Sequence, residues 1–267
     1  MAPRIFSFKK DHFEEVKTNL SDMYGWWQTV NISDVNGDGK QDLILGNIGE
    51  NFNLHPDKNQ PVKLWINDFN NNGVEDKILT RTVDGKDKPV FLKRELQDQI
   101  PSIKKQNLKH ADYTNKSIQE LFAPEVLSRC IVKQFNYVSS CIAVNSGNGN
   151  FVIQKMPPMV QLSSVNAVLS LDVNEDGYKD LVMAGNLLHF QPQLERLDAS
   201  YGHVLLNDGK GNFNWIEPLK SGLQVEGMVK DIQLLKTKDK NYLLFLRNND
   251  YPALYRVNNT LPGKAQH

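Results

Sequence analysis

The stretch Asp34-Val-Asn36-Gly-Asp38-Gly39-Lys-Gln-Asp42 decides how this chain is expected to fold, because its pattern recurs twice more. The other copies are Asp68-Phe-Asn70-Asn-Asn72-Gly73-Val-Glu-Asp76 and Asp172-Val-Asn174-Glu-Asp176-Gly177-Tyr-Lys-Asp180. Each copy places oxygen-bearing side chains at positions 1, 3, 5 and 9, with a glycine at position 6. Ca²⁺ takes about six to eight oxygen ligands, which a tight turn with alternate inward side chains can supply. The glycine permits a backbone angle that a residue with a Cβ would resist.

We therefore predict that these loops bind roughly two or three Ca²⁺ ions. The expected ligands are the side chains at positions 1, 3, 5 and 9 and the backbone carbonyl at position 7. In the first loop they are Asp34, Asn36, Asp38, Lys40 and Asp42; in the second, Asp68, Asn70, Asn72, Val74 and Asp76; in the third, Asp172, Asn174, Asp176, Tyr178 and Asp180. The amides at Asn70 and Asn72 replace carboxylates, which predicts weaker binding in the second loop.

The EF-hand shares the first half of this spacing, but it needs a glutamate at position 12 and flanking helices. Position 12 is Leu45, Leu79 or Met183, and short apolar runs such as Leu43-Ile44-Leu45 follow the ninth-position aspartate. Such runs favour buried strands. We therefore expect calcium loops between β-strands. The simpler alternative is that these are Asn/Asp/Gly turns that need no metal; the threefold recurrence argues against it.

A second repeated element is a hairpin closed by an aromatic residue. It reads Asn145-Ser-Gly147-Asn-Gly149-Asn-Phe151 and Asn207-Asp-Gly209-Lys-Gly211-Asn-Phe213. A less regular copy without the glycines is Phe8-Lys-Lys-Asp-His-Phe13. Glycine and asparagine in these places predict tight β-turns. Phe13 precedes Asp34 by 21 residues, and Phe151 precedes Asp172 by the same number. The repeat unit is thus hairpin, connecting segment, strand, acidic loop and strand.

Repeated four-stranded units predict an all-β chain of β-propeller blades, each of which buries its faces against its neighbours. We expect these blades over residues 1–258, with about four blades' worth of sequence and a flexible tail at 259–267. A further copy after Phe213, from Val229 to Asn249, keeps the strands and lacks the alternating carboxylates, so we predict no metal there.

Residues 92–135 interrupt the pattern, and we predict a small helical insertion there. Short helices are expected at 94–100, 102–106, 114–122, where Thr114 would be the N-cap, and from Pro124, which suits a first helical turn.

Composition excludes several classes of protein. The 31 basic and 31 acidic residues cancel, which argues against binding to nucleic acid. No run approaches the ~18 apolar residues of a membrane span. The start of the chain lacks the plan of a signal peptide; we expect either an intracellular protein or a fragment without its true N-terminus. Cys130 and Cys141 could pair, although two buried thiols are the simpler expectation.

The loops and hairpins together resemble the FG-GAP or VCBS repeats of integrin-α-type propellers. They are most similar to bacterial secreted proteins of the ASPIC/UnbV-like kind found in Bacteroidetes, on the evidence of Gly25-Trp26-Trp27 before the first loop and Gly46-Asn47 after it. The resemblance covers roughly residues 4 to 257. It implies a propeller at the cell surface or outside the cell, of which this chain could be one part.

Two functions fit this resemblance. The first is a non-catalytic binding or scaffold module, stabilised by calcium, for a protein or glycan partner, which could include the missing part of a larger propeller. The second is a propeller enzyme, a lyase or hydrolase acting on polysaccharide. The six histidines have no zinc-binding spacing, and the sequence contains neither a Gly-x-Ser-x-Gly elbow nor a Walker-type phosphate loop. We therefore favour the binding module.

Overall fold

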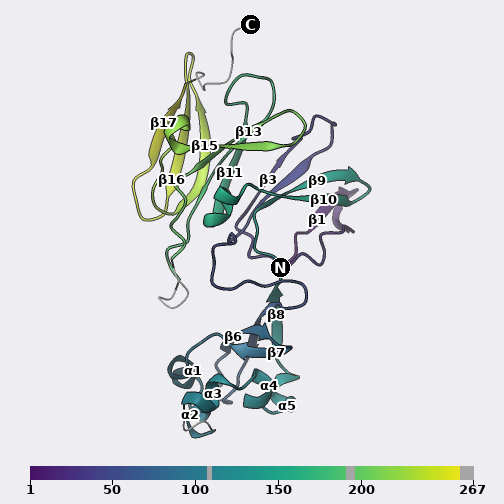
Figure 1. Cartoon of the computed structure of the whole chain (residues 1–267). Helices are drawn as coiled ribbons and strands as arrows, with labels where there is room; N and C mark the ends of the chain where they lie inside the picture. Colours follow the sequence, from purple (N-terminus) through teal and green to yellow (C-terminus); the bar gives the residue numbers. More distant parts are fainter. Residues whose placement is uncertain (107–109, 191–195, 259–267) are drawn as a thin grey trace. The chain divides into compact units, whose positions relative to one another are not determined.

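The computed structural model describes residues 1–106, 110–190 and 196–258, so the tail expected at 259–267 lies outside the described residues. Strands account for 41% of the chain and helices for 12%, which makes it a mostly-β protein. The chain divides into two compact units (Figure 1). The helical unit comprises Met1–Ala2, Met23–Gly25 and Leu54–Tyr137; the three-sheet unit comprises Pro3–Asp22, Trp26–Asn53 and the chain from Val138 onward.

The three-sheet unit consists of antiparallel sheets made mainly of consecutive strands. Sheet I has the strand order β10-β9-β4-β3, sheet II β11-β12-β13-β14 and sheet III β15-β16-β17, while β1 pairs with β2 as a separate hairpin. The strands are β1 (Ile5–Lys9), β2 (His12–Val16), β3 (Thr29–Ser33), β4 (Asp42–Gly46), β9 (Cys141–Gly147), β10 (Asn150–Lys155), β11 (Val165–Leu171), β12 (Asp180–Gly185), β13 (His203–Asn207), β14 (Phe213–Ile216), β15 (Val229–Lys236), β16 (Asn241–Arg247) and β17 (Ala253–Val257). Two short helical turns, η1 (Pro158–Leu162) and α6 (Pro218–Ser221), connect strands.

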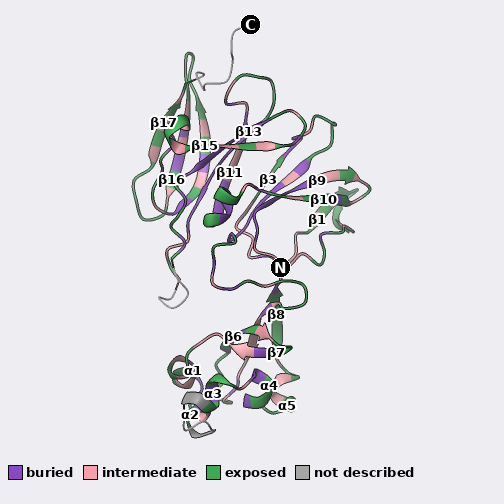
Figure 2. Cartoon of the chain, viewed as in Figure 1, coloured by how far each residue is buried: buried purple, intermediate pink, exposed green. Residues whose placement is uncertain are grey.

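The sheets of this unit pack face to face through two apolar layers. Ile44 and Ile142 of sheet I meet Leu181, Met183 and Leu205 of sheet II. On the other face of sheet II, a second layer joins sheet III. Each fully buried side chain of this size stabilises the fold by about 1.5–3 kcal/mol relative to leaving it exposed. Figure 2 shows the buried parts of β11 and β16 in purple.

The predicted four-stranded antiparallel sheets are confirmed for sheets I and II. Sheet III has three strands within the described part of the chain. β11 lies beside both β3 and β15, so the first strands of successive sheets are neighbours. Over the described residues the sheets do not close into a ring.

The helical unit contains one four-stranded antiparallel sheet, sheet IV, with the order β7-β6-β5-β8. Its elements are β5 (Val62–Asn67), β6 (Asp76–Val83), β7 (Lys86–Pro89), β8 (Ile131–Phe135), α1 (Lys93–Gln99), α2 (Ser102–Gln106), α3 (His110–Thr114), α4 (Ile118–Leu121) and α5 (Pro124–Leu127). Ile78 of the sheet packs with Leu96, Ile100 and Ile118 of the helical segment, and all four side chains are fully buried. The helices therefore cover one face of sheet IV.

The helical segment differs from the prediction in three details. The range predicted to be helical, 92–135, also contains strand β8, because β8 pairs with β5 far back along the chain. The compact unit is also larger than the predicted insertion, since it includes β5, β6 and the second acidic loop. Thr114 ends α3 and does not cap a helix; Ser117 precedes α4, and its N–H donates to the Glu120 carboxylate at 2.7 Å.

Candidate metal loops and their surroundings

All three acidic loops join neighbouring antiparallel strands. The first lies between β3 and β4, the second between β5 and β6, and the third between β11 and β12. A strand follows each ninth-position aspartate, as predicted, so the EF-hand plan of helix, loop and helix is absent from these described segments.

Inside each loop, the oxygen side chains accept hydrogen bonds from the loop's own backbone. The position-1 carboxylate accepts the N–H of the position-6 glycine at 2.8, 2.8 and 2.9 Å in the three loops. The position-3 amide oxygen accepts the position-5 N–H at 3.1, 3.1 and 3.2 Å. The position-5 oxygen accepts the N–H of Lys40, Val74 or Tyr178 at 2.9, 2.8 and 2.9 Å. The repeated sequence thus produces one turn structure three times.

The position-6 glycine is required by the backbone conformation. Gly39, Gly73 and Gly177 have φ of +80°, +83° and +93°, and a Cβ added at each would meet no atom within 4 Å. Space is therefore available in all three loops, and only the positive φ excludes ordinary residues.

We predict that Gly39→Ala destabilises the first loop by about 1 kcal/mol, because alanine adopts positive φ at a cost. Gly39→Asn should cost less, since asparagine tolerates the left-handed region better. Hydrogen exchange of the β4 amides would measure both changes. Equal losses in the two variants would contradict a backbone origin.

The ninth-position aspartate has a different role from the other acidic residues. Asp42 and Asp180 are fully buried. One oxygen of Asp42 accepts the Val35 N–H of its own loop at 2.9 Å, and the other accepts the Asn145 N–H at 2.7 Å. Asp180 repeats this arrangement with Val173 at 2.9 Å and with Asn207 at 2.9 Å. We call this carboxylate, with its two backbone donors, the aspartate latch.

Asn145 and Asn207 are the first residues of the two well-formed hairpins, so the latch joins each acidic loop to a hairpin. The Asn207 side-chain amide donates to the Lys179 carbonyl at 3.0 Å, and its Oδ1 accepts the Gly209 N–H at 3.0 Å. Asn145 makes the equivalent bonds to Gln41 and Gly147. The two sequence motifs are therefore parts of one hydrogen-bonded unit.

The second loop carries only part of this unit. Asp76 accepts the Phe69 N–H at 3.2 Å, as in the other loops. β6 then turns directly into β7 through Asp84 and Gly85. The asparagine hairpin therefore has no counterpart beside this loop.

Electrostatics separates the latch from the exposed carboxylates. Burial raises the pKa of Asp180 and Asp76, because a desolvated carboxylate is less stable when charged. The Lys40 backbone N–H lowers the pKa of Asp38, and the Gly73 N–H lowers that of Asp68. Backbone hydrogen bonds thus favour the ionised form of Asp38 and Asp68, whereas burial opposes ionisation of Asp180 and Asp76.

The donors in the loops are carboxylate and amide oxygens, which suit Ca²⁺. The carboxylates are not gathered, however: within residues 1–106, 110–190 and 196–258, no group of three or more His, Cys, Asp or Glu side chains is placed to hold a metal ion. Asp42 and Asp180, both expected ligands, point their oxygens at backbone amides. The donor chemistry fits the cation, while the arrangement found here is that of a hydrogen-bonded turn.

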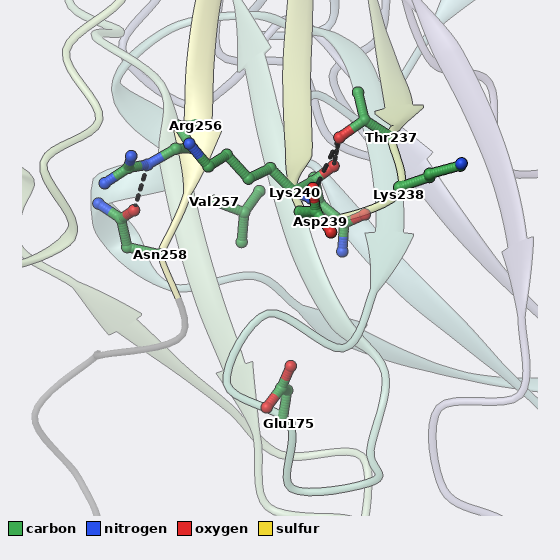
Figure 3. A pocket seen from close by; sticks show the side chains of 9 residues that line it. Glu175, Thr237, Lys238, Asp239, Lys240, Arg256, Val257 and Asn258 are labelled. Atoms are coloured by element: carbon green, nitrogen blue, oxygen red, sulfur yellow. Dashed lines mark hydrogen bonds between the residues drawn. The ribbon is translucent and has the colours of Figure 1, made fainter.

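A polar cleft of about 670 Å³ lies beside the third loop. Glu175 of that loop lines one side, while the turn from Thr237 to Asn241 and the strand end from Arg256 to Asn258 line the other (Figure 3). Thr237 Oγ1 accepts the Lys240 N–H at 3.1 Å, and Arg256 Nε donates to Asn258 Oδ1 at 2.6 Å. Sequence reasoning missed this cleft, for which the only signal was the basic run Lys236-Thr-Lys-Asp-Lys240.

A smaller aromatic pocket, of about 150 Å³, is lined by Trp26, Gln28, Leu187, His189 and Phe190. The Trp26 ring packs edge-on against Phe190, with centroids 5.6 Å apart, and against Phe52 at 6.1 Å. Trp26 is half-buried in this cluster, so it serves packing and also presents one wall of a pocket.

His203 is a buried histidine that the sequence did not single out. Trp215 Nε1 donates to its Nδ1 at 3.2 Å, and its Nε2 lies 3.2 Å from Ser200 Oγ. Nδ1 accepts, so Nε2 carries the proton and donates to the serine. The serine therefore has no neighbouring base to take its proton. Burial lowers the pKa of His203 to about 4.

Cys130 and Cys141 are thiols and do not form a disulfide. No helix among the described residues is long and apolar enough to cross a membrane. Compared with known proteins, the chain matches no protein-family model and no curated protein. The fold itself defines a mostly-β protein containing several four-stranded antiparallel sheets.

Proposed function

We propose that this chain is a non-catalytic scaffold of the FG-GAP/VCBS propeller type, stabilised by Ca²⁺ and working outside the cell or on its outer surface. The observation that carries this proposal is the repeated unit of acidic loop, aspartate latch and hairpin in sheets I and II. The unit uses its polar residues to hold strands together, as expected of a scaffold, and leaves the position-5 carboxylates, Asp38 and Asp176, exposed.

Calcium has a defined physical role in this proposal. Asp34 and Asp38 lie close in sequence and are not fully buried, so their charges repel one another in the closed loop. Asp172 and Asp176 stand in the same relation in the third loop. A bound Ca²⁺ would offset this repulsion and favour the closed turn. Loops of modest affinity suit the millimolar calcium outside cells.

We expect Ca²⁺ to raise the melting temperature of the three-sheet unit and EDTA to lower it again. A ligand at about 100 times its dissociation constant adds about 2.7 kcal/mol of stability, which corresponds to a shift of several degrees. Thermal melting at increasing Ca²⁺ concentrations would measure the shift.

Asp38→Ala should reduce this response, because it removes a first-loop ligand without touching the buried latch. Lys230→Ala, at an exposed site of β15 in the same unit and outside the three acidic loops, is a suitable control. Identical melting curves with Ca²⁺ and EDTA would overturn the calcium proposal and leave metal-independent turns. If Asp38→Ala responds to Ca²⁺ as strongly as the unmodified chain does, the first loop is not a Ca²⁺ site.

The polar cleft beside the third loop is the surface best suited to a glycan or a polar protein segment. Thr237, Asp239 and Asn241 offer hydrogen-bonding groups to hydroxyls, and Lys238 and Arg256 offer positive charge to acidic substituents. A glycan array with the intact chain tests this. Signals that persist unchanged in Arg256→Ala would place binding elsewhere.

A further inference from the structure

The fold holds the Asn-Gly steps of this chain in different ways. These steps are Asn36-Gly37 in the first acidic loop, Asn72-Gly73 in the second, and Asn148-Gly149 in the turn between β9 and β10. At an Asn-Gly step, the backbone nitrogen of the glycine can attack the side-chain amide carbon of the asparagine, because no Cβ on the glycine hinders the approach. The surroundings of that nitrogen and that side chain decide whether the reaction occurs.

In both acidic loops, the position-1 carboxylate binds the glycine nitrogen. The Gly37 N–H donates to Asp34 Oδ1 at 2.8 Å, and the Gly73 N–H donates to Asp68 Oδ2 at 2.8 Å. The nitrogen must lose its proton to react, and a negative nitrogen beside a carboxylate is disfavoured because like charges repel. The carboxylates therefore protect these two steps.

The asparagine side chains of the two loops are bound as well. Asn36 Oδ1 accepts the Asp38 N–H at 3.1 Å, and Asn72 Oδ1 accepts the Val74 N–H at 2.8 Å. Each side-chain amide is thus part of the hydrogen-bonded turn. The turn would have to open before the amide carbon could move to the glycine nitrogen.

The turn between β9 and β10 has neither restraint. Asn148 and Gly149 have φ of +56° and +78°, both positive as at the two central residues of a type I′ turn, whose own hydrogen bond joins the residues on either side. Within the described part of the chain, neither the Gly149 N–H nor the Asn148 side chain has a hydrogen-bond partner, and Asn148 is exposed. The equivalent place in the β13–β14 hairpin holds Lys210, which has no side-chain amide.

We propose that Asn148 is a site of spontaneous self-modification, at which the side-chain amide is lost. The Gly149 nitrogen forms a bond to Asn148 Cγ, the bond from Cγ to Nδ2 breaks, and the amide group leaves with the Gly149 proton as ammonia. The resulting succinimide ring then adds water. Cleavage of its new bond at Cγ gives aspartate, and cleavage of the original peptide bond gives isoaspartate, so nothing is oxidised or reduced. The turn must leave its folded angles for the attack, which costs little at an exposed turn.

The isoaspartate would weaken the hold of sheet I on the segment that follows β2. The Asn19 N–H donates to the Gly149 carbonyl at 3.4 Å, and the Asn19 side chain bonds to the Phe151 backbone at 2.8 and 2.9 Å. Gly149 also lies against Lys17, because a Cβ added to the glycine would come 2.4 Å from the Lys17 carbonyl oxygen. Isoaspartate adds a methylene to the main chain and a charged carboxylate at this close contact. The turn can then no longer fit the segment in the same way.

The test follows the reaction in the intact chain, in EDTA and a mildly alkaline buffer made with heavy-oxygen water. Each succinimide that opens takes its new oxygen from this water, so proteolysis and mass spectrometry identify the asparagine that has reacted. We expect label to accumulate at Asn148 about tenfold or more faster than at Asn36 or Asn72, since a hydrogen bond to a charged group is worth about that factor. In concentrated urea the rates should become similar, because the fold no longer protects the loops.

Asp34→Ala tests the protection directly, and it should raise the rate at Asn36 about tenfold or more. Asp34→Asn keeps one acceptor oxygen without the charge and should raise this rate by less. Asp172→Ala is the matched control, because it removes the same carboxylate from the third loop, which has no Asn-Gly step. The rate at Asn72, in the other compact unit, reports general unfolding; if it rises in Asp34→Ala, Asp34→Asn decides the question.

Three results would overturn the proposal: equal rates at the Asn-Gly steps in the folded chain, the same lead of Asn148 in urea, or an unchanged rate at Asn36 in both Asp34 variants. The structural consequence has its own measurement, hydrogen exchange of the Asn19 amide. Exchange should be faster in the separated isoaspartyl form than in Asn148→Asp, which carries the charge on an ordinary main chain. Equal exchange in these two forms would contradict the loosening. The inference depends neither on calcium nor on the scaffold function, so its failure would leave both untouched.

Discussion

Asp180→Ala is expected to lower the free energy of unfolding of the three-sheet unit by about 3 kcal/mol. The substitution removes the acceptor of two backbone donors, Val173 N–H and Asn207 N–H, at a fully buried position. Each buried donor left without a partner costs about 1–3 kcal/mol. The loss should be local at first, so hydrogen exchange of the β12 and β13 amides is the suitable measurement.

Asp176→Ala provides the control in the same loop. Asp176 is exposed and accepts the Tyr178 N–H, so its loss should cost well under 1 kcal/mol without calcium. Asp180→Asn should lower the free energy of unfolding by more than Asp176→Ala and by less than Asp180→Ala. The amide keeps one acceptor oxygen, but it replaces the other with an NH₂ donor that faces a backbone N–H. Equal effects of Asp176→Ala and Asp180→Ala in EDTA would show that the latch has no special structural role.

The sequence predicted the loop–strand arrangement well because the signals are local. The spacing from Asp172 to Asp180 and the apolar run after it predicted a strand on that side of the loop, and β12 lies there. The glycines of the hairpin from Asn207 to Phe213 predicted the turn between β13 and β14. Both results depend on backbone angles and on the order of a few neighbouring residues, which the local sequence determines.

The role of the ninth aspartate could not be predicted in this way. The partner of Asp42 is the N–H of Asn145, which lies 103 residues away in the sequence and becomes its neighbour only when β9 pairs with β4. A carboxylate in an acidic loop fits a metal ligand and a hydrogen-bond acceptor equally well until that pairing is known. The same limit applies to β8, because its pairing with β5, far back along the chain, cannot be read from its own five residues.

The second large effect is a loss of stability in mildly acidic solution caused by His203. Burial lowers its pKa from 6.5 to about 4 in the folded chain. Between those values, the unfolded chain binds a proton that the folded chain does not, so stability falls as the pH drops from about 6.5 to about 4. The full difference in pKa between the unfolded and folded chain corresponds to about 3 kcal/mol of unfolding free energy. Urea unfolding of the three-sheet unit at pH 7 and pH 5 would measure most of the change.

His203→Gln isolates this contribution, because glutamine keeps hydrogen-bonding groups near Trp215 and Ser200 but does not titrate. The variant should lose less stability between pH 7 and pH 5 than the original chain, even if it is less stable at pH 7. Asp180 and Asp76 act in the opposite direction, since a raised carboxylate pKa favours the folded chain as the pH falls. The two carboxylates are present in both His203→Gln and the original chain, so comparing these two chains cancels their contribution. An unchanged pH dependence in His203→Gln would mean that water reaches the imidazole in the folded state, and it would contradict the prediction.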